Sequence, residues 1–265
     1  MRNNVIDAFE LRNLIDQDSV IILDCRRERN EERIEGAQFV DFEIELTGQI
    51  IKGITGRHPL PRIDEFVKTC RKWGIGNDQQ VVVYDESTGA WASRLWWMLR
   101  WLGHDSVAVL NGGWNYWKAQ DFPISEKPKV HPESDFIPSE NKDWIATRSD
   151  VIQAQNNNKQ MIVDARAAKR YRGEHEPIDP VAGHIPTAIN LPFVENMNES
   201  GLWREKIEIK QRFEPVMNSD KENRTIMYCG SGVTACHNIL ATQFAELPIP
   251  RLYVGSWSDW INTLQ

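Results

Sequence analysis

Residues 225–240 read TIMYCGSGVTACHNIL, which is an apolar run, one cysteine, a glycine-rich turn and a second apolar run. The run before Cys229 has the length and composition of a buried strand, and the run after the turn is typical of a helix that begins near Ala235. In open α/β sheets, the turn between a strand and the following helix carries the functional groups. This stretch therefore predicts an α/β fold with its chemistry at Cys229.

The chain contains this pattern twice. Residues 81–97 read VVVYDESTGAWASRLWW and match residues 225–240. One further pair of matching segments precedes this pair and another follows it, and the offset between matched positions stays between 140 and 144 residues. We interpret the repeat as a tandem duplication, since a solenoid needs at least three short repeats.

Short runs rich in β-branched residues alternate with helix-like segments in both copies, which predicts a mostly parallel sheet flanked by helices in each. The expected strands cover residues 20–23, 81–84 and 107–110, then 161–163, 225–228 and 251–254. Residues 121–143 carry four prolines and no sustained apolar period, as in an extended connection. We therefore predict one domain over residues 1–125, a linker over 126–142 and a catalytic domain over 143–265.

Composition narrows the possible functions. The 265 residues are 41% hydrophobic and 26% charged, which is ordinary for folded domains. The 31 basic and 38 acidic residues leave a net charge of −7 without a basic run, so we expect no nucleic-acid partner. The N-terminal residues lack an apolar stretch of signal-peptide or membrane length, which predicts a cytoplasmic protein without membrane association. The four cysteines include no C-x-x-C pair for zinc or dithiol chemistry.

Cys229 is the candidate nucleophile. Glycines in the following turn let successive backbone N–H groups converge on one point, and the helix adds its positive N-terminal end. Such a cradle stabilises a thiolate, a persulfide anion or a negatively charged transition state. The residues expected to form it are Gly230, Ser231, Gly232, Val233 and Thr234. The alternative is a buried structural cysteine at a tight turn.

Four motifs resemble the C-terminal half of the tandem rhodanese-domain sulfurtransferases. They are Cys-Gly-Ser-Gly-Val-Thr-Ala at 229–235, Gly-His-Ile-Pro at 183–186, Asp-Ala-Arg at 164–166 with Arg-Tyr-Arg-Gly at 170–173, and Gly-Ser-Trp-Ser-Asp-Trp at 255–260. The resemblance covers essentially the whole chain and is greatest to the branch that uses 3-mercaptopyruvate. It implies two tandem rhodanese-like domains, the first of which has Asp85 in place of the cysteine and serves as a structural partner that forms one wall of the cleft.

The resemblance also implies the reaction. Sulfane sulfur would pass from 3-mercaptopyruvate to a persulfide on Cys229 and then to a thiol or cyanide, with release of pyruvate. It implies a small-molecule sulfur donor, a thiol acceptor for which a thioredoxin-like protein is a candidate, and no metal or organic cofactor. Sulfur transfer from thiosulfate to cyanide and a non-enzymatic sulfur carrier are the alternatives.

Further site residues follow from the same resemblance. Ser231 would assist proton movement near the sulfur, and Arg170 would bind the anionic group of the donor, for which a planar guanidinium is suited. The family's second arginine is replaced by Ile178, and Arg172 is a candidate substitute. The acid and the histidine that the family takes from its first half fall near Glu43 and His58, although that acid is normally aspartate. His184 of the Gly-His-Ile-Pro motif is interpreted as structural.

Two other classes of cysteine site fit less well. Cysteine phosphatases need an arginine six residues after the nucleophile, where this chain has Ala235. A zinc site at Cys229, Cys236 and His237 has poor ligand geometry, because adjacent residues of a helix project about 100° apart. Within the turn, Gly230 and Ser231 stand where thiosulfate-type enzymes carry arginine and lysine, which favours 3-mercaptopyruvate as the donor.

Overall fold

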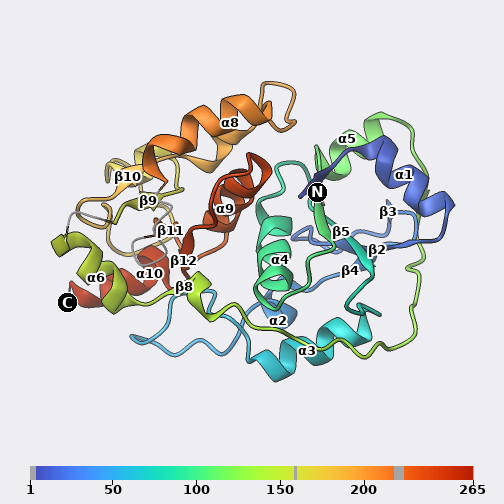
Figure 1. Cartoon of the computed structure of the whole chain (residues 1–265), viewed down its shortest axis with the longest axis horizontal. Helices are drawn as coiled ribbons and strands as arrows, with labels where there is room; N and C mark the ends of the chain where they lie inside the picture. The colour runs from blue at the N-terminus through green and yellow to red at the C-terminus, as the bar shows by residue number, and fades with distance from the viewer. Residues whose placement is uncertain (1–3, 158–159, 218–223, 265) are drawn as a thin grey trace. The chain divides into compact units, whose positions relative to one another are not determined.

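Two five-stranded parallel sheets form the framework of the chain, in a computed structural model that describes residues 4–157, 160–217 and 224–264 (Figure 1). The first sheet has the strand order β4-β2-β5-β6-β1, and the second has the matching order β10-β9-β11-β12-β8. The first comprises β1 (Val5–Ile6), β2 (Val20–Asp24), β4 (Gln38–Phe39), β5 (Gln80–Tyr84) and β6 (Val107–Leu110). The second comprises β8 (Ile145–Ala146), β9 (Ile162–Asp164), β10 (Ile189–Asn190), β11 (Ile226–Tyr228) and β12 (Arg251–Tyr253).

Helices connect the parallel strands, as the chain direction requires. The first half contains α1 (Ala8–Asp16), α2 (Phe42–Glu45), α3 (Ile63–Lys72), α4 (Ala90–Trp101) and α5 (Gly113–Ala119). The second contains α6 (Arg148–Asn157), α7 (Ala168–Tyr171), α8 (Lys206–Phe213), α9 (Thr234–Phe244) and α10 (Ser256–Trp260), with α8 packed beside α9 (Figure 1). Short 3-10 turns and a two-stranded antiparallel pair, β3 (Arg33–Ile34) with β7 (Ile124–Ser125), complete the fold. None of the helices in the described part of the chain has the length and apolar content needed to cross a bilayer.

The duplication is visible in corresponding contacts as well as in the strand order. The carbonyl oxygen of Asp85, after β5, accepts a hydrogen bond of 2.9 Å from the N–H group of Trp114. The carbonyl oxygen of Cys229, after β11, accepts one of the same length from the N–H group of Trp257. Asp85 and Cys229 therefore occupy equivalent positions in the two halves, as the sequence alignment predicts.

The loop after β5 is closed around its own anion. The buried Asp85 carboxylate accepts hydrogen bonds from four backbone N–H groups, those of Ser87, Gly89, Trp91 and Ala92, at 2.8–3.4 Å. Burial raises the pKa of Asp85, and these N–H groups oppose the rise by stabilising the charged form. The first copy of the loop is thus an anion cradle already filled by a side chain.

Replacing that side chain tests its structural importance. We expect Asp85→Ala to lower the free energy of unfolding by about 2–5 kcal/mol, because buried N–H donors lose a charged acceptor. Urea denaturation followed by circular dichroism measures the change. Asp64→Ala, at an exposed carboxylate in the first turn of α3, is the control and should change stability by less than about 1 kcal/mol. Equal effects of the two substitutions would show that the Asp85 carboxylate adds little to stability, because water can accept hydrogen bonds from the loop N–H groups in its place.

The chain forms two compact units that are interleaved in sequence. The first unit comprises the residues up to Gly48, Pro61–Asn141 and Glu199–Trp203, and the second comprises the remainder, including Gln49–Leu60. Most of the segment expected to be a linker, residues 126–142, packs within the first unit, where Ser139 donates a 2.8 Å backbone hydrogen bond to Leu102. The contribution of Gln49–Leu60 to the second unit was not anticipated, and it determines the composition of the candidate site.

Candidate active site at the Cys229 loop

Cys229 directly follows β11 and is only 2% exposed. The N–H group of Gly232 donates a hydrogen bond of 3.2 Å to its Sγ atom. The helix α9 begins at Thr234, one residue before the expected start at Ala235. The sulfur is therefore held by a backbone donor in the turn that leads into the positive end of an 11-residue helix, where a negative charge is stabilised.

The turn is fixed by close backbone packing. Gly232 has a φ of +78°, and a Cβ atom there would lie 2.6 Å from the carbonyl oxygen of Val254, so only glycine fits. On the other side, the carbonyl oxygen of Gly230 accepts a 2.9 Å hydrogen bond from the N–H group of Ser258 in α10. The loop that carries Cys229 is thus rigidly positioned before any donor binds.

A segment distant in sequence reaches this loop within the second unit. Gly56 allows the close approach, because a Cβ atom there would collide with the carbonyl oxygen of Gly255. The next residue, Arg57, donates its N–H group to Ser258 Oγ at 3.0 Å. His58 Nδ1 then lies 2.8 Å from Ser231 Oγ. The structure therefore brings together two of the candidate residues, Ser231 and His58, as a hydrogen-bonded pair.

Two guanidinium groups meet above Gly230. A Cβ atom built on Gly230 would lie 3.0 Å from Arg57 Nη2 and 3.4 Å from Arg170 Nη2. Arg170 was expected here from its motif. Arg57 was missed, although it stands next to His58 in the same Gly-Arg-His-Pro stretch, and that neighbourhood was the one available signal.

The two arginines belong to a chain of alternating charges. Successive members pair through Arg166–Asp164 at 2.6 Å, Arg166–Glu176 at 3.3 Å, Arg170–Glu176 at 2.6 Å and Arg170–Asp179 at 3.4 Å, and the last pair is Arg57–Asp179. We call these six residues the ionic chain. Its three cations and three anions balance, so the ionic chain as a whole has no net formal charge.

Cys25 and Cys70 lie in surroundings that disfavour the thiolate form. Burial raises the pKa of Cys25 strongly, with the neighbouring Asp24 adding to the rise, and burial also raises the pKa of Cys70. Both groups therefore remain protonated thiols at neutral pH and are poor nucleophiles. Burial lowers the pKa of Arg57, and its coulombic attraction to Cys229 opposes this shift.

Comparison with known proteins identifies the fold. The rhodanese-like domain family matches residues 7–120 and 147–263, which are the two copies of the repeat. The chain belongs to the rhodanese family. The two sheets with equivalent strand orders are therefore two rhodanese domains.

Similar rhodanese proteins are sulfurtransferases. A probable 3-mercaptopyruvate sulfurtransferase of Pseudomonas aeruginosa is 39% identical over 270 residues, which cover 97% of this chain and 95% of that protein. A thiosulfate sulfurtransferase of Gallus gallus is 35% identical, covering 90% of this chain and 82% of its own length. The crystal structure of SseA from Escherichia coli, a 3-mercaptopyruvate sulfurtransferase, matches with a TM-score of 0.81 and 32% identity, covering 97% of this chain and 99% of that one. This rhodanese is thus an enzyme of the sulfurtransferase class.

The other candidate residues lie in different surroundings. Arg172 is half exposed and pairs with Glu174 at 2.6 Å, so the structure does not bring it to the loop. Glu43 belongs to the first unit, where its half-exposed carboxylate lies 3.6 Å from Arg27. His184 Nδ1 lies 2.8 Å from the carbonyl oxygen of Tyr171, and its structural role stays a prediction.

The zinc alternative finds no support in the geometry. Cys236 Sγ donates a 3.2 Å hydrogen bond to the carbonyl oxygen of Gly232, and His237 Nδ1 lies 3.0 Å from Asn196 Nδ2. Within residues 4–157, 160–217 and 224–264, no group of three or more His, Cys, Asp or Glu side chains is arranged to hold a metal ion. Both residues therefore have structural partners in α9 and its surroundings.

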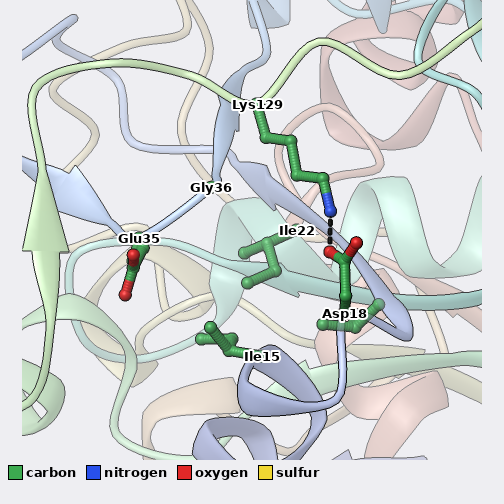
Figure 2. Close-up of a pocket in the computed structure, with 7 residues that line it drawn as sticks. Ile15, Asp18, Ile22, Glu35, Gly36 and Lys129 are labelled. Atoms are coloured by element: carbon green, nitrogen blue, oxygen red, sulfur yellow. Dashed lines mark hydrogen bonds and ion pairs between the residues drawn. The ribbon is translucent and has the colours of Figure 1, made fainter.

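The first unit contains a pocket of about 130 Å³ (Figure 2). Its apolar side chains include Ile15 and Ile22, and two of its lining residues, Lys129 and Asp18, form an ion pair. Its seven lining residues include neither a thiol nor an imidazole. This pocket therefore offers no candidate nucleophile among its lining side chains.

Proposed function

We propose that this rhodanese transfers sulfur from 3-mercaptopyruvate to a thiol through a persulfide on Cys229. In the first half-reaction, the Cys229 thiolate attacks the donor sulfur and forms an S–S bond while the donor C–S bond breaks. The bonding electrons stay with the three-carbon fragment, which takes the proton of the donor thiol and leaves as pyruvate. The observation that carries the proposal is the Cys229 sulfur held by the Gly232 N–H group beside the Ser231–His58 pair.

Proton transfer is assigned to Ser231 with His58. The donor thiol must lose a proton, and the carbon that leaves the sulfur must gain one. Ser231 Oγ, at 2.8 Å from His58 Nδ1, can relay a proton between these positions, while the histidine ring accepts or returns it. The backbone N–H groups from Gly230 to Thr234 stabilise the persulfide anion that remains.

Donor recognition is assigned to Arg170. The donor carries one carboxylate, and a guanidinium binds a carboxylate through two parallel hydrogen bonds. Arg170 is 17% exposed and already oriented by Glu176, so little side-chain entropy is lost when a donor binds.

The second half-reaction regenerates the enzyme. A thiolate acceptor attacks the outer sulfur of the persulfide, which breaks the S–S bond and returns Cys229 as a thiolate. Cyanide accepts the same atom as thiocyanate. We propose a cytoplasmic setting, where thiols remain reduced, and a thioredoxin-like protein as a candidate acceptor.

One comparison of donors tests the proposed reaction. We expect pyruvate release from 3-mercaptopyruvate to be faster than thiocyanate formation from thiosulfate, with cyanide as the acceptor in both assays. The turn lacks a cationic side chain at Gly230 and Ser231, and at an effective dielectric of 20 the attraction between two unit charges about 5 Å apart is worth roughly 3 kcal/mol.

Two results would contradict the proposal. Equal or faster reaction of thiosulfate would identify a thiosulfate sulfurtransferase. A single load of sulfur without continued pyruvate release would identify a sulfur carrier.

A further inference from the structure

We infer that Arg57 is a second residue that binds the anionic group of the sulfur donor, acting beside Arg170 above Gly230. The inference rests on the proposed function and adds a residue from the segment Gln49–Leu60 to donor recognition. It starts from the ionic chain, in which Arg57 is the terminal member.

The position of Arg57 in the chain leaves it able to bind a further anion. Arg166 lies between Asp164 and Glu176, and Arg170 lies between Glu176 and Asp179. Among the ion pairs of the described residues, Arg57 has one carboxylate partner, Asp179. Since a guanidinium offers five N–H donors, the terminal arginine can bind a second carboxylate without losing the first.

The solvent exposure of the three arginines in the ionic chain also indicates that Arg57 can bind a further anion. The side chain of Arg166 is 1% exposed, that of Arg170 is 17% exposed and that of Arg57 is 30% exposed. Arg57 is therefore the most accessible of these three cations to an anion that arrives from solvent. A partly buried site of this kind strengthens a charged hydrogen bond relative to one at a fully exposed surface.

The guanidinium is also close to the reacting atoms. Its Nη2 atom would lie 3.0 Å from a Cβ atom on Gly230, the residue that follows the nucleophile. A donor whose sulfur contacts Cys229 can reach this group only if its anionic group is a few atoms from the sulfur. A short 2-keto acid thiol has that geometry, since its carboxylate is separated from the sulfur by two carbon atoms.

The backbone holds Arg57 in place before the donor arrives. Its N–H group is bonded to Ser258 Oγ, and Gly56 allows the segment to lie against Gly255. Asp179, only 3% exposed, orients the side chain through its ion pair with the guanidinium. Such preorganisation lowers the entropic cost of binding an anion.

Steady-state kinetics with 3-mercaptopyruvate tests the inference. We expect Arg57→Ala to raise KM about 10- to 100-fold with a smaller change in kcat, because charge-assisted hydrogen bonds to the donor are lost. Arg57→Lys should recover part of the loss, because lysine restores the charge but not the planar set of N–H donors. Lys52→Ala, an exposed cation in the same segment, is the control for net charge and should leave KM unchanged. An unchanged KM for Arg57→Ala would overturn the inference.

The same substitution in a D179N variant separates donor binding by Arg57 from a structural role of Arg57. Arg57→Ala leaves the buried Asp179 carboxylate without this partner, so the same substitution is also made with D179N, which removes the charge of the carboxylate. If Arg57 binds the donor, Arg57→Ala raises KM by a similar factor with and without D179N. If Arg57 only neutralises Asp179, the effect disappears in the D179N background and the inference is wrong.

Binding of pyruvate gives a readout without turnover. Calorimetry with the Cys229→Ser protein should show pyruvate bound about 10-fold or more weakly when Arg57→Ala is added. Equal binding with and without Arg57, or no binding in either, would overturn the inference. Absence of pyruvate release by the wild-type enzyme, together with Arg57-dependent binding of pyruvate, would instead refute the proposed reaction and leave the anion site standing.

Discussion

Cys229→Ser is expected to lower turnover of 3-mercaptopyruvate by roughly four orders of magnitude or more, because removing the nucleophile of a covalent mechanism eliminates the reacting atom itself. Serine is close to cysteine in size, and the sulfur accepts one hydrogen bond from Gly232 that an oxygen can also accept. We therefore expect the variant to fold normally. Pyruvate release measures the loss, and circular dichroism checks the fold.

Mass spectrometry identifies the atom that carries the sulfur. After treatment of the wild-type protein with donor and no acceptor, the intact mass should increase by one sulfur atom, and peptide mapping should place it on Cys229. Cys25→Ala is the matched control, since burial raises the pKa of that thiol and keeps it protonated; it should retain nearly full activity. An added sulfur on Cys25, Cys70 or Cys236 would contradict the assigned nucleophile.

Arg170→Ala is expected to cost about 2–4 kcal/mol of transition-state binding, a loss of roughly 30- to 1000-fold in kcat/KM for 3-mercaptopyruvate. The reason is that a partly buried guanidinium beside Gly230 would no longer offset the charge of the donor. The effect should shrink as salt increases, because ions screen the attraction between Arg170 and the donor in the wild-type enzyme. Measuring kcat/KM at several ionic strengths tests both expectations.

A nearby arginine supplies the control for this substitution. Arg172 is two residues away, carries the same charge and pairs with Glu174 at the surface, so Arg172→Ala should leave kcat/KM nearly unchanged. Glu176 retains Arg166 at 3.3 Å when Arg170 is removed, which limits the structural damage. A thermal melt checks that the variant is folded. If kcat/KM of Arg170→Ala equals that of the wild type, Arg170 has no part in donor binding.

The inner strands were predictable because their signal is local. Each of the six expected strands corresponds to one of the three inner strands of its sheet, with ends that differ by at most one residue. The edge strands β1, β4, β8 and β10 were not predicted. Each has two residues, which is too short for a hydrophobic period to appear. Their pairing is decided by the neighbouring strand that they join.

The loop after β5 was also predictable only in part. The sequence predicts that Asp85 stands at the position equivalent to Cys229 and that a carboxylate there cannot act as a sulfur nucleophile. It did not show that the backbone N–H groups of the loop fold onto the Asp85 carboxylate, since amide direction depends on backbone angles. The replacement therefore both removes a nucleophile and fills the anion cradle.

The amino-acid sequence alone determined the duplication and the α/β class, and it predicts the candidate centre, because the cysteine, its glycines and the start of the helix are neighbours in the chain. Only the tertiary structure decided which distant side chains complete that centre. His58 lies 173 residues before Ser231, and Arg57 lies 122 residues before Asp179. These pairs exist because Gly56 lets Gln49–Leu60 lie against α10, and a contact of that kind depends on packing in space, for which one sequence carries no local signal.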